Sequence, residues 1–164
     1  RYAKDSQTMV SALARALITA YDVKPVIICP EDNKKAVFQC ANAVGLHVME
    51  EIEALKRLPF SMGIVTFTKD KNQAEVQADR MMKNMMPKAV ISIEAPGANC
   101  GGGYHNADGM NVTDLEAKTD ILFEKLRESG VLNIAIGDLG NEIGMGAIAE
   151  HIKKYIPYSG PNQC

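Results

Sequence analysis

Short apolar runs alternate with amphipathic helical segments along the whole sequence. A strand that is apolar along its entire length is covered on both faces, which is typical of parallel sheets flanked by helices. We therefore predict an α/β fold: a three-layer αβα sandwich with a mostly parallel, Rossmann-like sheet of about five strands. The predicted strands are 25–29, 46–49, 62–67, 89–93 and 133–136.

The segments between these runs repeat apolar residues at helical spacing. Asp70, with a glutamine three residues later, predicts a helix start, and Gly45 predicts a helix end. Thr113–Glu116 resembles a capping box, so we expect a further helix from there to about Gly130. The remaining helices are expected over about 6–21, before Gly45, and around 148–155, with a helical turn near 51–56.

Length and composition limit the classes of protein that need to be considered. The 164 residues fit a single domain, 1–164, or an incomplete portion of a longer domain. Apolar residues make up 46% and charged residues 23%, which excludes a disordered chain. A formal net charge of −2 argues against a nucleic-acid partner. No run approaches the ~18 apolar residues of a membrane span. Cysteines without paired spacing favour reduced thiols, and hence the cytoplasm or a mitochondrial matrix.

Glycine is concentrated in two stretches that each follow a predicted strand. Nine of the 13 glycines lie in Glu94–Gly109, the first loop, or in Gly137–Gly146, the second loop. In parallel sheets, ligands bind beyond the carboxyl ends of the strands. Glycine there lets the backbone approach a ligand closely. We therefore expect the two loops to meet at one edge of the sheet and to form the functional site.

The first loop is long for a strand–helix connection and rich in polar side chains. It carries Glu94, Tyr104, His105 and Asn106, which could orient and protonate a small polar substrate. The backbone of its glycine run, including Gly102 and Gly103, could contact the same substrate.

The second loop carries Asp138, Gly140, Asn141 and Glu142. Asn141 and Glu142 are expected to open a helix, where a carboxylate can cap the free N–H groups, while Asp138 could be only a turn former. The carboxylates of Glu94, Asp138 and Glu142 could alternatively hold a divalent cation. Neither loop has the glycine spacing of a nucleotide site, so no nucleotide cofactor is expected.

These segments resemble the D-glutamate cyclase family. The resemblance is clear over about residues 88–156, and its most specific string is the second loop, Gly137-Asp138-Leu139-Gly140-Asn141-Glu142-Ile143-Gly144-Met145-Gly146. It also includes the segment from 91 to 106, Met110-Asn111-Val112 and Asp120-Ile121-Leu122-Phe123.

The resemblance implies a hydro-lyase that converts D-glutamate to 5-oxo-D-proline. It implies catalytic roles for Glu94, His105, Asp138 and Glu142. Glu94 or Asp138 would be the base, and His105 or Tyr104 would protonate the departing oxygen. The residues implied to bind substrate are Gly102, Gly103, Tyr104, Asn106, Gly140 and Asn141.

Two other classes of protein stay open. One is another acid–base or metal-dependent enzyme acting on a small amino or carboxylic acid. The other is a module that binds a small acid without chemistry. In each case the expected partner is a small molecule, with no nucleic acid and no membrane, and a homo-oligomer is compatible with the sequence.

Overall fold

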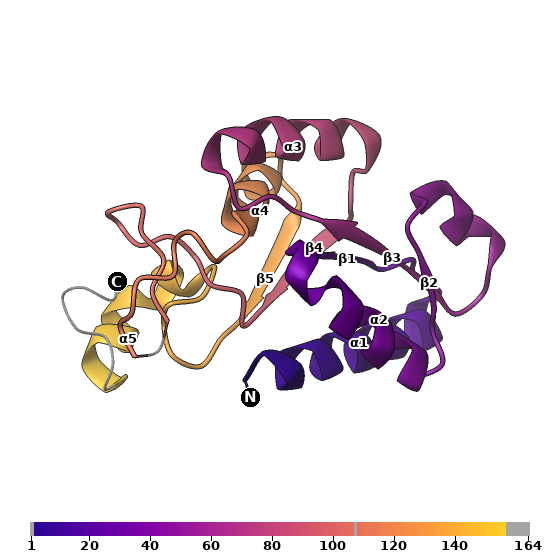
Figure 1. The fold of residues 1–164 in the computed structure, drawn as a ribbon, viewed down its shortest axis with the longest axis horizontal. Helices are drawn as coiled ribbons and strands as arrows, with labels where there is room; N and C mark the ends of the chain where they lie inside the picture. The colour runs from indigo at the N-terminus through magenta and orange to yellow at the C-terminus, as the bar shows by residue number, and fades with distance from the viewer. Residues whose placement is uncertain (1, 107, 157–164) are drawn as a thin grey trace. The chain divides into compact units, whose positions relative to one another are not determined.

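The computed structural model describes residues 2–106 and 108–156 of the chain (Figure 1). Contacts between residues divide the chain into two compact units, Arg1–Phe67 and Thr68–Cys164. Each unit contains one parallel sheet with its own helices. The candidate site residues all belong to the second unit.

The first unit is a three-stranded parallel sheet with strand order β1-β3-β2. Its central strand, β3, pairs with β1 on one side and with β2 on the other. In chain order its elements are α1 (Tyr2–Tyr21), β1 (Val26–Cys29), α2 (Glu31–Ala43), β2 (His47–Met49), the 3₁₀ helix η1 (Ile52–Arg57) and β3 (Ser61–Thr66).

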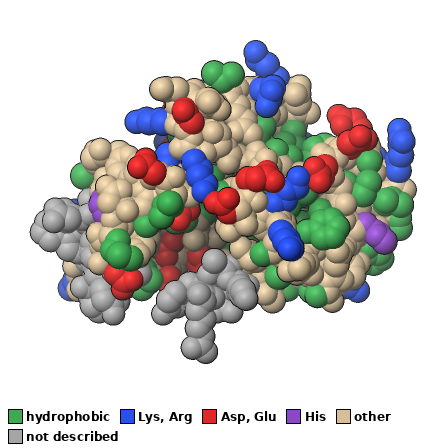
Figure 2. Space-filling model, in the orientation of Figure 1, with side chains coloured by type: hydrophobic (Ala, Val, Ile, Leu, Met, Phe, Trp, Pro, Cys, Tyr) green, Lys and Arg blue, Asp and Glu red, His purple; other side chains and the backbone are tan. Residues whose placement is uncertain are grey.

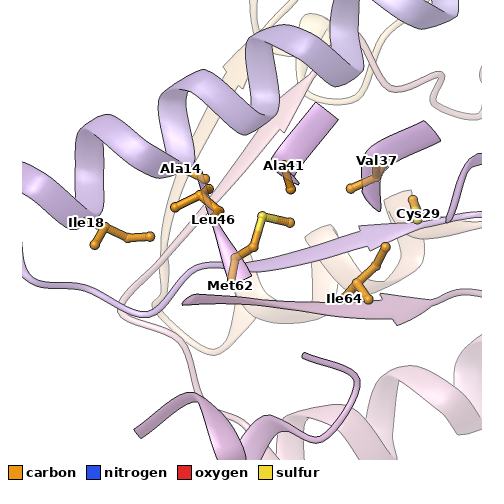
Figure 3. Close-up of a cluster of buried hydrophobic side chains, with 8 residues drawn as sticks. All are labelled: Ala14, Ile18, Cys29, Val37, Ala41, Leu46, Met62 and Ile64. Atoms are coloured by element: carbon orange, nitrogen blue, oxygen red, sulfur yellow. The ribbon is translucent and has the colours of Figure 1, made fainter. Parts of the chain in front are cut away.

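Two helices cover one face of this sheet and form its core (Figure 3). Ala14 and Ile18, four residues apart on α1, point the same way, as do Val37 and Ala41 on α2. They meet Cys29, Leu46, Met62 and Ile64. The thiol of Cys29 is free and lies inside this cluster.

The second unit contains a two-stranded parallel sheet in which β4 and β5 lie side by side (Figure 1). The two strands pair in register from Ala89 opposite Leu132 to Ile93 opposite Ile136. In chain order the elements are α3 (Lys71–Asn84), β4 (Ala89–Ile93), α4 (Thr119–Glu128), β5 (Leu132–Ile136), the 3₁₀ helix η2 (Met145–Ile148) and α5 (Ala149–Tyr155).

The predicted α/β class and the parallel pairing of the strands are confirmed. Hydrogen bonding nevertheless divides the strands into sheets of three and two, where the sequence predicts one sheet of about five. On β5 the side chains alternate between half-buried and exposed, and Leu132, Ile134 and Ile136 are exposed. Apolar character therefore identified each strand but not its neighbours.

Two of the predicted helix boundaries are confirmed by their geometry. The Asp70 carboxylate accepts the N–H groups of Asn72 at 2.8 Å and Gln73 at 3.0 Å, as expected of an N-cap. Gly45 follows α2 with φ of +73°, a conformation that favours glycine.

The predicted capping box at Thr113–Glu116 is wrong. Those residues form turns, and α4 begins at Thr119. The hydroxyl of Thr113 accepts the backbone N–H of Tyr104 at 2.9 Å, so it serves the first loop and not a helix. A hydroxyl that caps a helix and one that braces a distant loop give the same sequence pattern.

Charged side chains of both signs are interspersed over the face drawn in Figure 2. None of the helices in the described part of the chain has the length and hydropathy that a membrane span requires.

Candidate functional site

The first and second loops meet, as the sequence predicts. They follow β4 and β5, which are adjacent and parallel, so their carboxyl ends lie at the same edge. Beyond the strands, Pro96 and Glu142 form an antiparallel bridge. The N–H of Gly97 donates to the carbonyl of Asn141 at 2.9 Å, and the N–H of Ile143 donates to that of Ala95, also at 2.9 Å. Main-chain hydrogen bonds thus join the two loops.

Gly97 is needed where the loops cross. A Cβ at this position would lie 3.2 Å from the backbone N and Cα of Ile143. That is tighter than an ordinary van der Waals contact, and backbone atoms give way less readily than a flexible side chain. A side chain at position 97 would therefore push the loops apart.

Glu142 shapes the second loop. Its carboxylate accepts three backbone N–H groups, from Asp138 at 2.9 Å, Leu139 at 3.0 Å and Gly140 at 2.7 Å. The residue is only 8% exposed. The prediction that Asn141 and Glu142 open a helix is wrong, because the next helical turn begins at Met145. The carboxylate does cap free N–H groups, but they belong to the preceding turn.

Asp138 and Glu142 have shifted acidities because they lie together. A hydrogen bond with Glu142, then burial, then the charges of Glu142 and Glu94 raise the pKa of Asp138 above its ordinary value. Burial alone would raise the pKa of Glu142, but hydrogen bonds from the N–H groups of Asp138 and Leu139 outweigh it and lower that pKa. The two carboxyls thus have pKa values shifted in opposite directions, upward for Asp138 and downward for Glu142.

Glu94 is the third carboxylate of this cluster. It follows β4 with φ of +48°, which is uncommon for a residue other than glycine. Its N–H donates to the carbonyl of Ile136 at 2.8 Å, which continues the strand pairing by one residue. Its negative charge contributes to the raised pKa of Asp138. The structure thus brings together Glu94, Asp138 and Glu142, which come from two loops about forty residues apart in sequence.

The alternative of a divalent cation has no preformed ligand set here. Within 2–106 and 108–156, no group of three or more His, Cys, Asp or Glu side chains is arranged to hold a metal ion. Glu142 explains part of this, since its oxygens already accept backbone N–H groups. Binding a cation would require the second loop to rearrange, and a cation requirement stays an untested alternative.

His105 lies where the two loops are tied together. Its Nδ1 is 3.2 Å from the side-chain amide nitrogen of Asn99, and its carbonyl accepts the side-chain N–H of Asn141 at 2.8 Å. An amide that donates to Nδ1 leaves the proton of the neutral ring on Nε2. Asn141 therefore braces His105 from the second loop, and Asn99 orients the ring within the first.

Tyr104 is buried beneath the first loop, only 3% exposed. Its hydroxyl donates to the Asp120 carboxylate at 2.5 Å, and the Lys118 ammonium lies 4.3 Å from the centre of its ring. Burial first, then the hydrogen bond to Asp120, raises the pKa of Tyr104 far above its ordinary value. Asp120 also accepts the N–H of Ala98 at 3.1 Å, so one carboxylate holds two points of the loop.

Several of the groups expected to contact substrate are hydrogen-bonded within their own loop. The Asn99 side-chain oxygen accepts the N–H groups of Gly101 and Gly103, and its carbonyl accepts that of Gly102. The Asn106 side-chain oxygen accepts the N–H groups of Asp108 and Met110. The N–H of Gly140 donates to Glu142. Contact of Gly102, Gly103, Asn106 and Gly140 with substrate stays a prediction.

Sequence reasoning missed three residues that organise the site: Asn99, Lys118 and Asp120. An asparagine two residues before a glycine is a recognisable turn former, so Asn99 could have been found. Asp120, in the first turn of α4, was hidden by the misplaced helix start. Nothing in the local sequence indicates that Lys118 is buried, 4% exposed, against a tyrosine.

Comparison with known proteins gives the family of the chain. The profile of the family described as "D-glutamate cyclase-like, C-terminal" matches residues 9–164. The chain belongs to this family. The match extends well beyond the segment of about 88–156 in which the resemblance is clear by inspection.

A curated relative of this D-glutamate cyclase-like chain is the human protein named "D-glutamate cyclase, mitochondrial". The two are 26% identical over 139 residues, which is 81% of this chain and 23% of the relative. The chain thus spans about a quarter of the length of that relative.

Proposed function

We propose that this chain carries the site of a hydro-lyase that converts D-glutamate to 5-oxo-D-proline and water. The observation that carries the proposal is the cluster of Glu94, Asp138 and Glu142, in which the pKa of one carboxyl is raised and that of its neighbour is lowered. Paired acids with opposed pKa shifts are typical of acid–base catalysis. Membership of the D-glutamate cyclase-like family supports D-glutamate as the proposed substrate.

The reaction sets clear requirements. The substrate ammonium loses a proton, its nitrogen attacks the γ-carboxyl carbon, and a C–N bond forms as a C–O bond breaks. The departing oxygen leaves as water, so it must receive protons. No electrons are gained or lost, and the chemistry therefore needs no redox cofactor. Holding the substrate folded removes much of the entropic barrier to ring closure.

Two of the carboxylates fit the proton transfers. Glu94 is assigned as the base that takes the ammonium proton. Asp138 is assigned as the acid, because the neighbouring Glu142 keeps a proton on it at higher pH than an ordinary aspartate would hold one. Glu142 keeps its charge and fixes the turn that carries Asp138.

His105 is the second candidate for the proton donor. Its Nε2–H would face the γ-carboxylate and stabilise the tetrahedral oxyanion. Tyr104, the other donor implied by the family resemblance, is assigned a positioning role, because its hydroxyl is buried and donates to Asp120.

The test is direct. The protein is incubated with D-glutamate or L-glutamate, with and without Mg²⁺ or Mn²⁺, and 5-oxoproline is followed by NMR. We expect turnover of the D-isomer that falls at least 100-fold in Asp138→Asn and in Glu94→Gln, as loss of a general acid or base predicts.

Other outcomes separate the alternatives. Saturable binding of D-glutamate without turnover would support a binding module. Activity only with added metal would support the cation alternative at Glu94, Asp138 and Glu142. Full activity in both variants would contradict the proposed roles.

The reducing compartment expected from the cysteines, cytoplasm or mitochondrial matrix, stays a prediction.

A further inference from the structure

The two loops of the candidate site contain no lysine or arginine. They do contain four acidic residues: Glu94, Asp108, Asp138 and Glu142. The substrate class of the proposed function, on which this inference rests, carries two carboxylates. An anion does not bind stably among like charges without a local cation. The cation must therefore come from outside both loops.

Lys71, the first residue of α3, lies against the first loop. Its ammonium nitrogen is 4.0 Å from the point that a Cβ on Gly102 would occupy. It is the nearest atom to that point apart from the glycine and its chain neighbours. Gly102 has φ of +79°, a conformation that favours glycine, and it has no side chain that would stand between its backbone and the ammonium.

The glycine next to Gly102 borders the His105 ring. Gly103 follows Gly102, and a Cβ on Gly103 would lie 3.3 Å from Cε1 of His105. Lys71 and the His105 ring thus flank two consecutive glycines. His105 in turn is tied to the second loop through Asn141. A substrate lying along the glycines could contact the ammonium at one end and the acid cluster at the other.

The two other lysines near the first loop are already engaged. Lys118 donates to the carbonyls of Thr113 and Glu116, faces the Tyr104 ring, and is 4% exposed. Lys69 stands beside Glu116, where its charge acts on that carboxylate. Lys71 is exposed, and no carboxylate of the described residues forms an ion pair with it.

We propose that Lys71 determines substrate specificity by binding the carboxylate of D-glutamate that does not react. Its ammonium pairs with the α-carboxylate, while the γ-carboxyl lies at the acid cluster. This contact is the same in the ground state and the transition state, so it acts on KM and not on kcat. It accounts for binding of a diacid by loops that carry only negative charge.

The test compares Lys71→Met with Lys83→Met. Lys83 is an exposed lysine in the last turn of the same 14-residue helix, about 18 Å away along its axis. We expect Lys71→Met to raise KM for D-glutamate about 10- to 100-fold at similar kcat, as loss of one charged contact predicts. Lys71→Arg should recover most of the loss, and Lys83→Met should behave as the wild type. Thermal unfolding checks that each variant is folded.

A binding measurement separates this inference from the proposed function. Glutarate, a diacid without an amine, cannot cyclise, and its affinity is measured by calorimetry. Weaker glutarate binding in Lys71→Met would support the inference even if D-glutamate is not turned over. Turnover with an unchanged KM in Lys71→Met would overturn the inference and leave the function standing. Absence of both turnover and glutarate binding in the wild type would overturn both.

Discussion

Replacing Glu142 by glutamine should destabilise the second unit and open the second loop. The carboxylate accepts three backbone N–H groups, from Asp138, Leu139 and Gly140. A glutamine keeps one acceptor oxygen and turns an N–H₂ group toward at least one of these donors. A hydrogen bond to a charged group contributes about 1.5–3 kcal/mol, and an unsatisfied buried donor costs about 1–3 kcal/mol. Because the loop can relax so that water satisfies some of these donors, we expect the unfolding free energy to fall by about 2–4 kcal/mol.

The effect should depend on pH with a defined sign. The pKa of Glu142 is lower in the folded protein than in the unfolded chain, because its hydrogen bonds to N–H groups outweigh its burial. Its stabilisation is therefore present above the ordinary glutamate pKa and is lost as pH falls through the lowered value. The difference in unfolding free energy between Glu142→Gln and wild type should be largest at pH 7 and should disappear in strong acid.

The assay is urea unfolding followed by circular dichroism at several pH values. Glu128→Gln is the control, since Glu128 is an exposed acid at the end of α4 and its replacement changes the net charge equally. Surface substitutions of this kind change stability by less than about 0.5 kcal/mol. If Glu142→Gln loses no more than the control, or if its deficit is the same at pH 3 and pH 7, the carboxylate does not hold the loop.

Three further predictions concern the second unit and the thiols. Tyr104→Phe should cost about 1–3 kcal/mol in unfolding free energy by removing the hydrogen bond to Asp120, and a double-mutant cycle with Asp120→Asn should show positive coupling; additive effects would contradict the contact. Gly144→Ala should cost about 2–4 kcal/mol, because φ is +88° and the new methyl would lie 2.5 Å from a β5 side chain; a neutral effect in thermal unfolding would refute the geometry. Burial first, and then the charge of Glu31, raises the pKa of Cys29 to about 11, so a thiol reagent at neutral pH should modify exposed Cys100 before buried Cys29, and equal rates at these two thiols would disprove this.

The position of the site could be predicted from the sequence, because two local signals coincided. Glycine-rich segments followed apolar strands, and parallel neighbours end at the same edge, so the carboxylates of Glu94 and Asp138 were expected together. The strands that precede these two acids pair up to Ile93 and Ile136, and the N–H of Glu94 donates to the carbonyl of Ile136. Strand and helix type were predictable for the same reason, since periodicity is a local property.

The parts that could not be predicted depend on partners distant in sequence. The residues of a strand do not indicate which other strand it pairs with, so the sequence did not predict the division into two sheets. The Thr113 hydroxyl was misread because its donor, Tyr104, is nine residues away. Lys71 was overlooked because it precedes the glycine run by about thirty residues and meets it only in the folded unit.

Two main-chain hydrogen bonds link the two loops, from Gly97 to Asn141 and from Ile143 to Ala95, beside the side-chain bond from Asn141 to His105. Every residue type has a peptide group, so many side chains on these loops can change without breaking the main-chain hydrogen bonds between the loops. Evolution could therefore exchange Glu94 or Asp138 at this edge while the main-chain contacts keep the loops aligned, whereas Glu142 is tied to the shape of the second loop. Such a frame is suited to acquiring new substrates by a few substitutions, and engineering should begin at the displayed positions and spare the glycines.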